Sequence, residues 1–449
     1  MSTYGKMLLG IGLVWVTQLY AADYPLPEPA VKTDFPRPDD AKTNLGRLLF
    51  YDKILSGNRN ISCATCHHAL TATGDGWSLS VGEGGLGLGV ARNTGQGLNE
   101  IHARVPRNAP PVFNLGAASF DTLFADGRVQ ADAGQPSGFK TPAGDDLPTG
   151  ILENVLAAQA MFPVTSGTEM AGQSGENDIA NLSAVNDFNG VWQLLAERLR
   201  SVPEYVALFQ QSFPEVHGAA DITYAHAANA IAAFEGTAWR CDNSRFDQYL
   251  RGRQDVLSAQ EKRGVKLFYG KADCAQCHSG TFQTDGDFHA IAMPQIGPGK
   301  GDNLPGYTDG LDDFGRERVT KKREDRFKFR TPSLRMVEWT GPWGHDGAYN
   351  SLEGVVRHHL NATAALKSYD TRQAVLPLRP DLSALDFVVQ NDPARRKSIA
   401  AASEIQPIAL DDREVADLMA FLFSLTDHRC TDLRRDVPQR VPSGLTIAD

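Results

Sequence analysis

The sequence predicts a mostly α-helical protein with two domains in tandem. The pentapeptide C-x-x-C-H occurs twice in the 449 residues, at 63–67 and at 274–278. Apolar residues at helical spacing lead into each copy. No block of the chain is rich in strand patterns, so an internal repeat of one helix followed by one C-x-x-C-H organises the sequence.

The C-x-x-C-H motif indicates covalent attachment of a c-type haem. Two thiols bond the vinyl groups of one porphyrin, and the adjacent histidine becomes the proximal ligand of the iron. A thioredoxin-like pair does not require the histidine, and a four-thiolate zinc site usually keeps its C-x-x-C pairs close in sequence. The sequence therefore predicts two cytochrome c-like haem domains in tandem, held by Cys63, Cys66, His67, Cys274, Cys277 and His278.

Composition excludes some classes of partner. Apolar residues make up 42% and charged residues 22% of the chain, as in ordinary soluble globular proteins. The net charge of -10 argues against nucleic acid as a partner and is compatible with a basic redox protein.

The N-terminus has the order of a secretory signal peptide. Lys6 precedes an apolar run over 7–20, and two small residues follow the run. Export agrees with haem attachment, which takes place outside the cytoplasm, so we expect residues 1–22 to direct the protein to the periplasm. Tyr20 is a poor residue before a cleavage site, which keeps an uncleaved anchor as the alternative, although the run is short for a membrane span.

Helical spacing of apolar residues predicts the domain contents. Ser258 and Glu261 form a capping box at the start of one helix. An arm, an N-terminal domain and a C-terminal domain are expected at 23–40, 23–240 and 241–449. The expected helices span 40–52, 192–199, 205–213, 224–234, 258–268 and 411–425.

Two further features stay open. Cys241 and Cys430 form either a disulfide or two free buried thiols. Residues 361–407 are a polar, proline-containing insertion whose structure the pattern does not determine. Residues 74–107 form a glycine-rich loop that contains G-x-G-x-x-G. No strand precedes it and no helix of the right pattern comes after it, so we expect a flexible loop over a haem face, not a dinucleotide site.

The second axial ligand of each haem decides its chemistry. A haem that only carries electrons usually has both axial positions filled, whereas one that reacts with peroxide keeps one open. After the first motif, His68 is too close to His67 to reach the other haem face, and His102 is the next candidate. After the second motif the candidates are Met293, Met336, His345, His358 and His359.

The chain resembles the bacterial dihaem cytochrome c peroxidases and the MauG-like enzymes, which oxidise residues of a partner protein. The resemblance covers roughly 41–360 and 411–426. It is carried by the two haem motifs and by matching stretches in one order, at 45–52, 106–110, 124–128, 169–170, 203–205, 245–250 and 345–347.

The resemblance implies roles for individual residues. His67 and His278 would be the proximal ligands. Gln159 and Glu169 match a catalytic pair on the peroxide side of the first haem, where the glutamate would move a proton between the peroxide oxygens. Arg330 and His345 match residues near the haems, for propionate contacts.

The resemblance also implies one calcium ion between the domains. Asn108, Thr340 and Pro342 match its ligands, one through a side-chain oxygen and two through backbone carbonyls. Such a set of oxygens with water suits a hard cation.

Three departures from the peroxidase pattern matter. The histidine that closes the first haem falls at Glu100, with His102 two residues on, so this haem is expected to be open without reductive activation. The methionine that ligates the second haem falls at His359, which removes a ligand that raises the potential. The tryptophan between the haems falls at Ala125, so electrons must take another route.

The expected function is that of a periplasmic peroxidase, which reduces hydrogen peroxide to water with electrons from a small cytochrome c or cupredoxin. A MauG-like oxidase that modifies a side chain of a partner protein is the alternative, and a non-enzymatic dihaem electron carrier is the third. The insertion could cover a haem edge, dock a partner or only pad the fold. A homodimer stays open.

Overall fold

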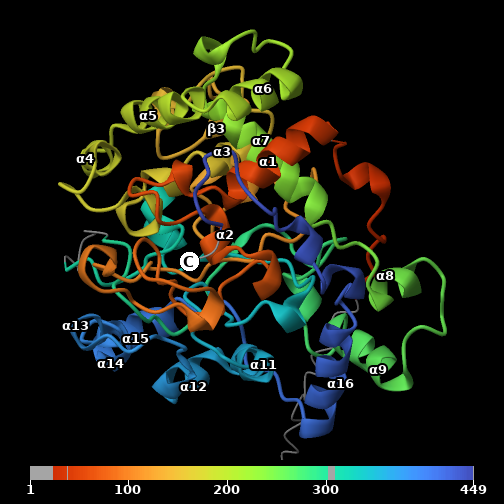
Figure 1. The fold of residues 1–449 in the computed structure, drawn as a ribbon. Helices are drawn as coiled ribbons and strands as arrows, with labels where there is room; N and C mark the ends of the chain where they lie inside the picture. Colours follow the sequence, from red (N-terminus) through yellow and green to blue (C-terminus); the bar gives the residue numbers. More distant parts are fainter. Residues whose placement is uncertain (1–23, 38, 302–308, 448–449) are drawn as a thin grey trace, which may run out of the picture.

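The structure is a computed structural model that describes residues 24–37, 39–301 and 309–447 (Figure 1). The signal peptide expected at 1–22 lies outside the described residues. Helices dominate, as predicted. None of the described helices has the length and apolar character needed to cross a membrane.

Helices of the N-terminal half enclose the larger hydrophobic core. The helix α1 (Asp40–Tyr51) crosses α7 (Tyr224–Ala238) at Gly46. A Cβ at Gly46 would lie 1.7 Å from the Ala230 carbonyl oxygen, so only glycine permits this close crossing. The other helices of this half are α2 (Cys63–Cys66), α3 (Val155–Ala160), α4 (Asp178–Ala184), α5 (Phe188–Arg200) and α6 (Pro203–Ser212).

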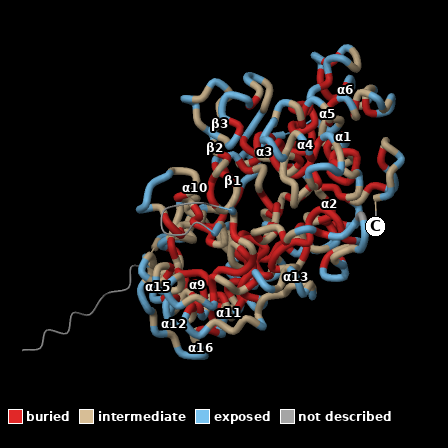
Figure 2. The backbone as a smooth tube through the Cα atoms, turned by 90° about the vertical axis from the view of Figure 1, so that its left-hand side faces the viewer, coloured by how far each residue is buried: buried red, intermediate tan, exposed pale blue. Residues whose placement is uncertain are grey.

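The C-terminal half repeats this arrangement around a second core. The helix α9 (Ala259–Phe268) crosses α16 (Asp412–Phe423), and a Cβ at Gly264 would lie 2.1 Å from the Asp417 carbonyl oxygen. The expected capping box forms, because Ser258 Oγ accepts from the Glu261 N–H and the Glu261 carboxylate accepts from the Ser258 N–H. Figure 2 shows buried segments both near α1 and α2 and near α9 and α11.

The strands are short and few in the described chain. A three-stranded antiparallel sheet contains β1 (Thr122–Leu123), β2 (Val129–Ala131) and β3 (Phe139–Lys140), with Thr122 opposite Gln130 and Ala131 opposite Phe139. A second antiparallel pair consists of β4 (Phe288–His289) and β5 (Phe329–Arg330).

The remaining helices lie in the C-terminal half, and most of them are in the insertion. The polar segment 361–407, whose structure the sequence left open, is largely helical and forms the side of the molecule that carries α12 to α15 (Figure 1). These helices are α8 (Arg245–Leu250), α10 (Glu317–Thr320), α11 (Leu352–Leu360), α12 (Ala362–Lys367), α13 (Pro380–Ser383), α14 (Val388–Asn391) and α15 (Pro393–Ala401).

All six helices predicted from the sequence are present. The largest difference in extent is at α5, which begins at Phe188 instead of residue 192, and at α7, which continues to Ala238. In α5 the Asp187 side chain accepts from the Gly190 N–H, and this N-cap starts the helix before the apolar pattern that predicted it.

The two terminal segments cross between the halves. The N-terminal arm reaches the second half, where the Tyr24 N–H donates to the Tyr269 carbonyl oxygen at 2.8 Å. The C-terminal segment returns to the first half, where the Ser443 hydroxyl donates to Asp52 Oδ1 at 2.6 Å. The N-terminal arm and the C-terminal segment therefore each contact the opposite half of the chain.

Cys241 and Cys430 form a disulfide, which settles the alternative that the sequence left open. The bond joins the segment after α7 to the returning C-terminal segment, across 189 residues.

Replacing both cysteines by alanine (Cys241→Ala with Cys430→Ala) should lower the free energy of unfolding by about 2–5 kcal/mol, because the unfolded chain gains freedom when a long loop is opened. Denaturant unfolding of the haem-loaded protein measures this, with reduced wild type as the matched control. An unchanged unfolding midpoint in both samples would show that the bond contributes no stability.

Candidate haem sites

The first motif forms a tight turn that presents its histidine. The helix α2 holds both cysteines, and the His67 N–H donates to the Cys63 carbonyl oxygen at 3.0 Å. His67 Nδ1 lies 3.0 Å from the Thr73 carbonyl oxygen. Because a carbonyl only accepts, this contact places the proton on Nδ1 and leaves the lone pair of Nε2 free for a metal.

The second motif repeats this geometry. A single 3-10 turn spans Cys274–Gln276, and the His278 N–H donates to the Cys274 carbonyl oxygen at 2.9 Å. His278 Nδ1 lies 3.2 Å from the Gln283 carbonyl oxygen, so Nε2 is again left free.

The motif residues fit covalently bound haem. The four motif cysteines are free thiols, and with His67 and His278 they keep some accessible surface, whereas Ala64 and Ala275 between them are buried. Burial nevertheless raises the pKa of Cys63 to about 12 and lowers that of His278 to about 4. These side chains keep accessible surface, yet the protein around them excludes bulk water. Side chains with both properties line an internal space, as the wall of a haem pocket must.

His359 on α11 faces the second motif. Its ring centroid lies 6.3 Å from that of His278. An imidazole nitrogen binds a transition metal at about 2 Å, so two imidazoles on one metal ion place their centroids roughly 6 Å apart. His359 Nδ1 lies 2.8 Å from the Val355 carbonyl oxygen, which leaves its Nε2 free. The spacing therefore fits one metal ion between His278 and His359.

His358 has no free nitrogen. Its Nδ1 lies 2.9 Å from the Tyr349 hydroxyl, and its Nε2 lies 2.8 Å from the Ile291 carbonyl oxygen. Burial lowers the pKa of His358 to about 3, so the ring is neutral. The geometry favours His359 over His358 as a ligand.

The other candidates of the second motif are occupied elsewhere. Met336 Sδ accepts from the Asp427 N–H at 3.2 Å, and Met293 packs in the second core. His345 differs from the two methionines: its ring stacks on Phe329, with centroids 3.7 Å apart, but its Nδ1 has no hydrogen-bond partner in the described chain.

Glu169 lies on the side of the first motif. It sits in a five-residue π-helical turn (Gly167–Ala171), a rare element that is frequent at functional sites, while its neighbour Met170 is buried. Burial lowers the pKa of His67, and the Thr73 hydrogen bond and the nearby Glu169 carboxylate oppose this shift. Glu169 is thus close enough to act on the imidazole electrostatically.

Gln159 stands near the end of α3, and its side chain is partly buried. Within the described residues, neither the Gln159 amide nor the Glu169 carboxylate has a hydrogen-bond partner. Partly buried polar groups without partners are available to a bound molecule.

A cluster of buried charges beside Glu169 was missed by sequence reasoning. Asp126 forms ion pairs with Arg107 at 2.9 Å and with Arg128 at 3.1 Å, and Arg107 also binds Asp313 at 2.6 Å. Burial opposes the charge of Asp126, but the arginines outweigh it and hold the pKa of this carboxyl well below its usual range. The cluster joins the two halves of the chain. The only signal in the sequence was that 106–110 and 124–128 belong to the stretches that carry the resemblance.

Lys300 belongs to the same neighbourhood. Burial, and next the positive charge of Arg128, lower the pKa of Lys300 to about 8, while Glu169 opposes the shift. No motif in the sequence pointed to this lysine.

The glycine-rich loop is organised around an arginine. The Arg92 side chain is 2% exposed, and its guanidinium donates to the carbonyl oxygens of Gly82, Gly84 and Gly87. A phosphate site would turn N–H groups inward, whereas here the carbonyls of G-x-G-x-x-G point at a cation. The structure agrees with the rejection of a dinucleotide site.

Glu100 and His102, the two loop residues that could close the first haem site, are both exposed at the surface. His102 is 54% exposed and lies 3.2 Å from Glu176, with which it can form an ion pair. Glu100 lies 3.3 Å from Arg379 of the insertion. Both side chains are thus held in surface contacts.

The insertion is fastened to this loop. Arg104 and Asp386 form a two-armed ion pair, at 2.7 and 3.0 Å, with side chains only 2% and 3% exposed. The Ser78 N–H donates to the Val375 carbonyl oxygen at 2.9 Å, and the Val375 N–H donates to Ser78 Oγ at 2.8 Å. The insertion therefore contacts the glycine-rich loop at two places, one of them a buried ion pair.

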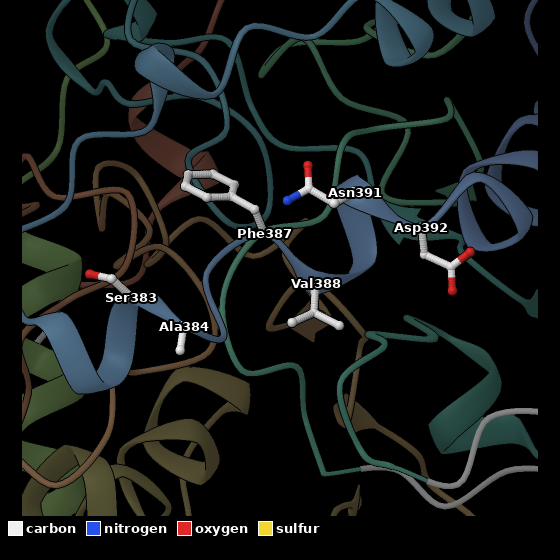
Figure 3. Close-up of a pocket in the computed structure, with 6 residues that line it drawn as sticks. All are labelled: Ser383, Ala384, Phe387, Val388, Asn391 and Asp392. Carbon is white, nitrogen blue, oxygen red and sulfur yellow. The ribbon is translucent and has the colours of Figure 1, made fainter.

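One pocket on the insertion is not a haem site. It has a volume of about 430 Å³ and lies between α13 and α14 (Figure 3). None of the haem-motif residues or candidate iron ligands described above lines this pocket. Its lining consists of Ser383, Ala384, Phe387, Val388, Asn391 and Asp392.

Arg330 suits an anionic group. Its guanidinium contacts only backbone carbonyls, those of Phe124 at 3.3 Å and Thr331 at 3.4 Å, and no ion pair of Arg330 is found in the described chain. Burial lowers the pKa of Arg330 to about 10. A partly buried arginine with no carboxylate partner is suited to bind a propionate.

The three residues matched to calcium keep free oxygens. The Asn108 amide nitrogen donates to the Trp77 carbonyl oxygen at 2.8 Å, which leaves its side-chain oxygen available. No described residue donates a hydrogen bond to the carbonyl oxygen of Thr340 or Pro342. Oxygens of this kind are suitable ligands for a hard cation.

Replacing Asp386 by alanine should leave Arg104 as a buried unpaired charge and cost about 3–5 kcal/mol of local stability. We expect amide hydrogen exchange in 74–107 to accelerate by roughly a hundredfold or more. The matched control is Asp381→Ala, because Asp381 also pairs with an arginine of the insertion, Arg379, but is exposed. If both variants exchange like the wild type, the ion pair does not hold the loop.

Comparison with known proteins agrees with the geometry. A family model described as di-haem cytochrome c peroxidase matches residues 40–255. Methylamine utilization protein MauG of Methylorubrum extorquens is 30% identical over 408 residues, which cover 88% of this chain and 84% of the relative. Cytochrome c551 peroxidase of Pseudomonas aeruginosa is 29% identical over 336 residues, which cover 74% of this chain and 75% of the relative.

A solved structure shows the same fold. The crystal structure of a MauG-like protein associated with microbial copper homeostasis matches with a TM-score of 0.58 and 26% identity, over 96% of this chain and all of that one. The resemblance found in the sequence is confirmed. The chain belongs to the di-haem cytochrome c peroxidase family, to which the MauG proteins are also related.

Proposed function

We propose that this protein reduces hydrogen peroxide to water at the first C-x-x-C-H site. The observation that carries the proposal is that the Glu169 carboxylate acts on the His67 imidazole and has no hydrogen-bond partner among the described residues, while the two candidate blocking residues are held at the surface. A bound haem would supply the iron that takes up the peroxide. The protein supplies the groups around it.

Each residue of the first site has a separate role in the proposed reaction. His67 would bind the iron through Nε2, and Cys63 and Cys66 would hold the porphyrin. The Gln159 amide orients the peroxide. The Glu169 carboxylate accepts the proton from one peroxide oxygen and returns it to the other, so that water leaves when the O–O bond breaks.

The second site passes electrons to the first. His278 and His359 would both bind the iron of the second haem through Nε2, and Arg330 and His345 would contact its propionates. An imidazole in place of a thioether lowers the potential of such a centre. At the position expected for a tryptophan, the Ala125 carbonyl oxygen accepts from the Arg330 N–H at 2.8 Å, which offers a backbone route between the halves.

The proposed function also includes a location, two haem domains and a calcium ion. Residues 1–22 direct export to the periplasm, where a small cytochrome c or cupredoxin donates the electrons. The two halves, 23–240 and 241–449, are the two haem domains. One calcium ion, bound by Asn108, Thr340 and Pro342, holds them together.

A second candidate function is that of a MauG-like oxidase that modifies a side chain of another protein. The His278–His359 pair favours it, since a centre of low potential stabilises an oxidised state, and a MauG protein is among the relatives. Turnover of peroxide with a reduced small cytochrome supports the peroxidase. A long-lived oxidised species without such turnover supports the oxidase.

Replacing Glu169 by glutamine should slow the reaction with peroxide by about 10²–10⁴-fold, because the proton carrier is lost while size and shape are kept. Stopped-flow absorption of the ferric haem-loaded protein measures the rate. Glu176→Gln is the control, since Glu176 lies nearby and contacts the surface residue His102. Full peroxide reactivity of the Glu169 variant would remove the proton-transfer role.

Replacing His359 by alanine should convert the second haem from low spin to high spin, because one axial ligand is lost. Electron paramagnetic resonance of the resting ferric protein measures the change. The matched variant His358→Gln should keep the low-spin signal. Should the two variants exchange these results, His358 would be the ligand.

A further inference from the structure

Tyr349 and His358 form a buried pair with one possible arrangement of protons. His358 Nε2 lies 2.8 Å from the Ile291 carbonyl oxygen, and a carbonyl only accepts, so Nε2 carries the ring proton. Nδ1 of the neutral ring therefore holds a lone pair, and it lies 2.9 Å from the Tyr349 hydroxyl. The Tyr349 O–H thus donates to an imidazole nitrogen. Tyr349 is 4% exposed and His358 is 1% exposed, so the hydrogen bond is buried.

The pair lies directly behind the second haem site. The ring centroid of His358 is 6.0 Å from that of His359, which in turn faces His278 at 6.3 Å. The Tyr349 ring lies 5.3 Å from that of His358. Short steps between rings of this kind allow an electron to leave Tyr349 toward the second site.

The other tyrosines of the described chain lack this combination. Tyr24 and Tyr205 donate to the carboxylates of Asp273 and Asp52, and neither ring packs against a motif histidine or His359. Tyr369 lies 5.6 Å from Tyr349 between ring centroids, but its hydroxyl donates to the Ala348 carbonyl oxygen. An amide carbonyl is a far weaker base than imidazole, so Tyr369 has no good acceptor for its proton.

We propose that Tyr349 is a redox-active residue that supplies one of the two electrons taken up by peroxide. This inference rests on the proposed function. Reduction of one hydrogen peroxide to two waters consumes two electrons and two protons. Tyr349 gives one electron, its O–H bond breaks, and the proton crosses the existing hydrogen bond to His358 Nδ1. The other electron would come from the iron of a bound haem, and both protons consumed by peroxide come from solvent water.

The proton need not leave the pair. An oxidised phenol is a very strong acid, so even a weakly basic neutral imidazole accepts its proton. His358 keeps its Nε2 hydrogen bond to Ile291 in the protonated state. When an external electron reduces Tyr349, the proton returns from Nδ1 to the phenolic oxygen, and the pair regains its starting state.

The test is freeze-quench electron paramagnetic resonance of the haem-loaded protein after mixing with hydrogen peroxide. Wild type should show an organic radical whose signal narrows when the protein contains ring-deuterated tyrosine. Tyr349→Phe keeps the buried ring but should lose at least nine-tenths of this signal, as an order-of-magnitude expectation for removal of the oxidised group. Tyr369→Phe, the neighbouring control, should keep it.

Two results would overturn the proposal. One is a deuterium-sensitive radical of unchanged size in Tyr349→Phe, and the other is a wild type that reacts with peroxide without forming a tyrosine radical. The absorption spectrum before mixing shows whether a variant has folded and bound both haems.

A wild type that does not react with peroxide refutes the proposed function instead. In that case a one-electron oxidant, hexachloroiridate(IV), replaces peroxide. A tyrosine radical that Tyr349→Phe abolishes and Tyr369→Phe retains then still supports the role of Tyr349, and its absence from wild type refutes that role.

Discussion

One hydrogen bond, from imidazole Nδ1 to a backbone carbonyl, is shared by the three histidines that the two haem sites present to a metal. His67, His278 and His359 each make it, to Thr73, Gln283 and Val355. In each case Nε2 keeps its lone pair and the ring is fixed in direction. His358 differs because both of its nitrogens are bonded, which makes it a neighbour of the site and not a ligand. The division of roles between adjacent histidines results from this single contact.

A common scaffold carries two different sites. In each half a helix precedes the motif and crosses a later helix at a glycine, Gly46 in one and Gly264 in the other. The difference between the sites arises from the segment after each motif. After the first comes the glycine-rich loop that folds around Arg92, and it leaves the Glu169 side of His67 without an imidazole. After the second, the chain returns through α11 and places His359 opposite His278.

Local patterns in the sequence were enough to predict the motifs, the six helices and the family, because each depends on neighbouring residues. Features that depend on long-range contacts were not predictable. The Arg104–Asp386 pair joins residues 282 positions apart, and neither residue stands in a motif. The choice between His358 and His359 depends on the rotation of α11, which contacts with Tyr349 and Ile291 fix. The pairing of Cys241 with Cys430 likewise needs the returning C-terminal segment.

The contact between the insertion and the glycine-rich loop bears on how the reaction with peroxide is controlled. A first site that opens only after reduction needs a loop that can rearrange. Here the insertion contacts the loop through a buried ion pair and through two hydrogen bonds between Ser78 and the Val375 backbone. Opening that contact would leave a buried charge unpaired, at a cost of several kcal/mol. Under the proposed function, peroxide therefore meets the same pocket in every oxidation state. Control of the reaction then lies in the supply of electrons through the second site, where the His278–His359 pair and Tyr349 stand.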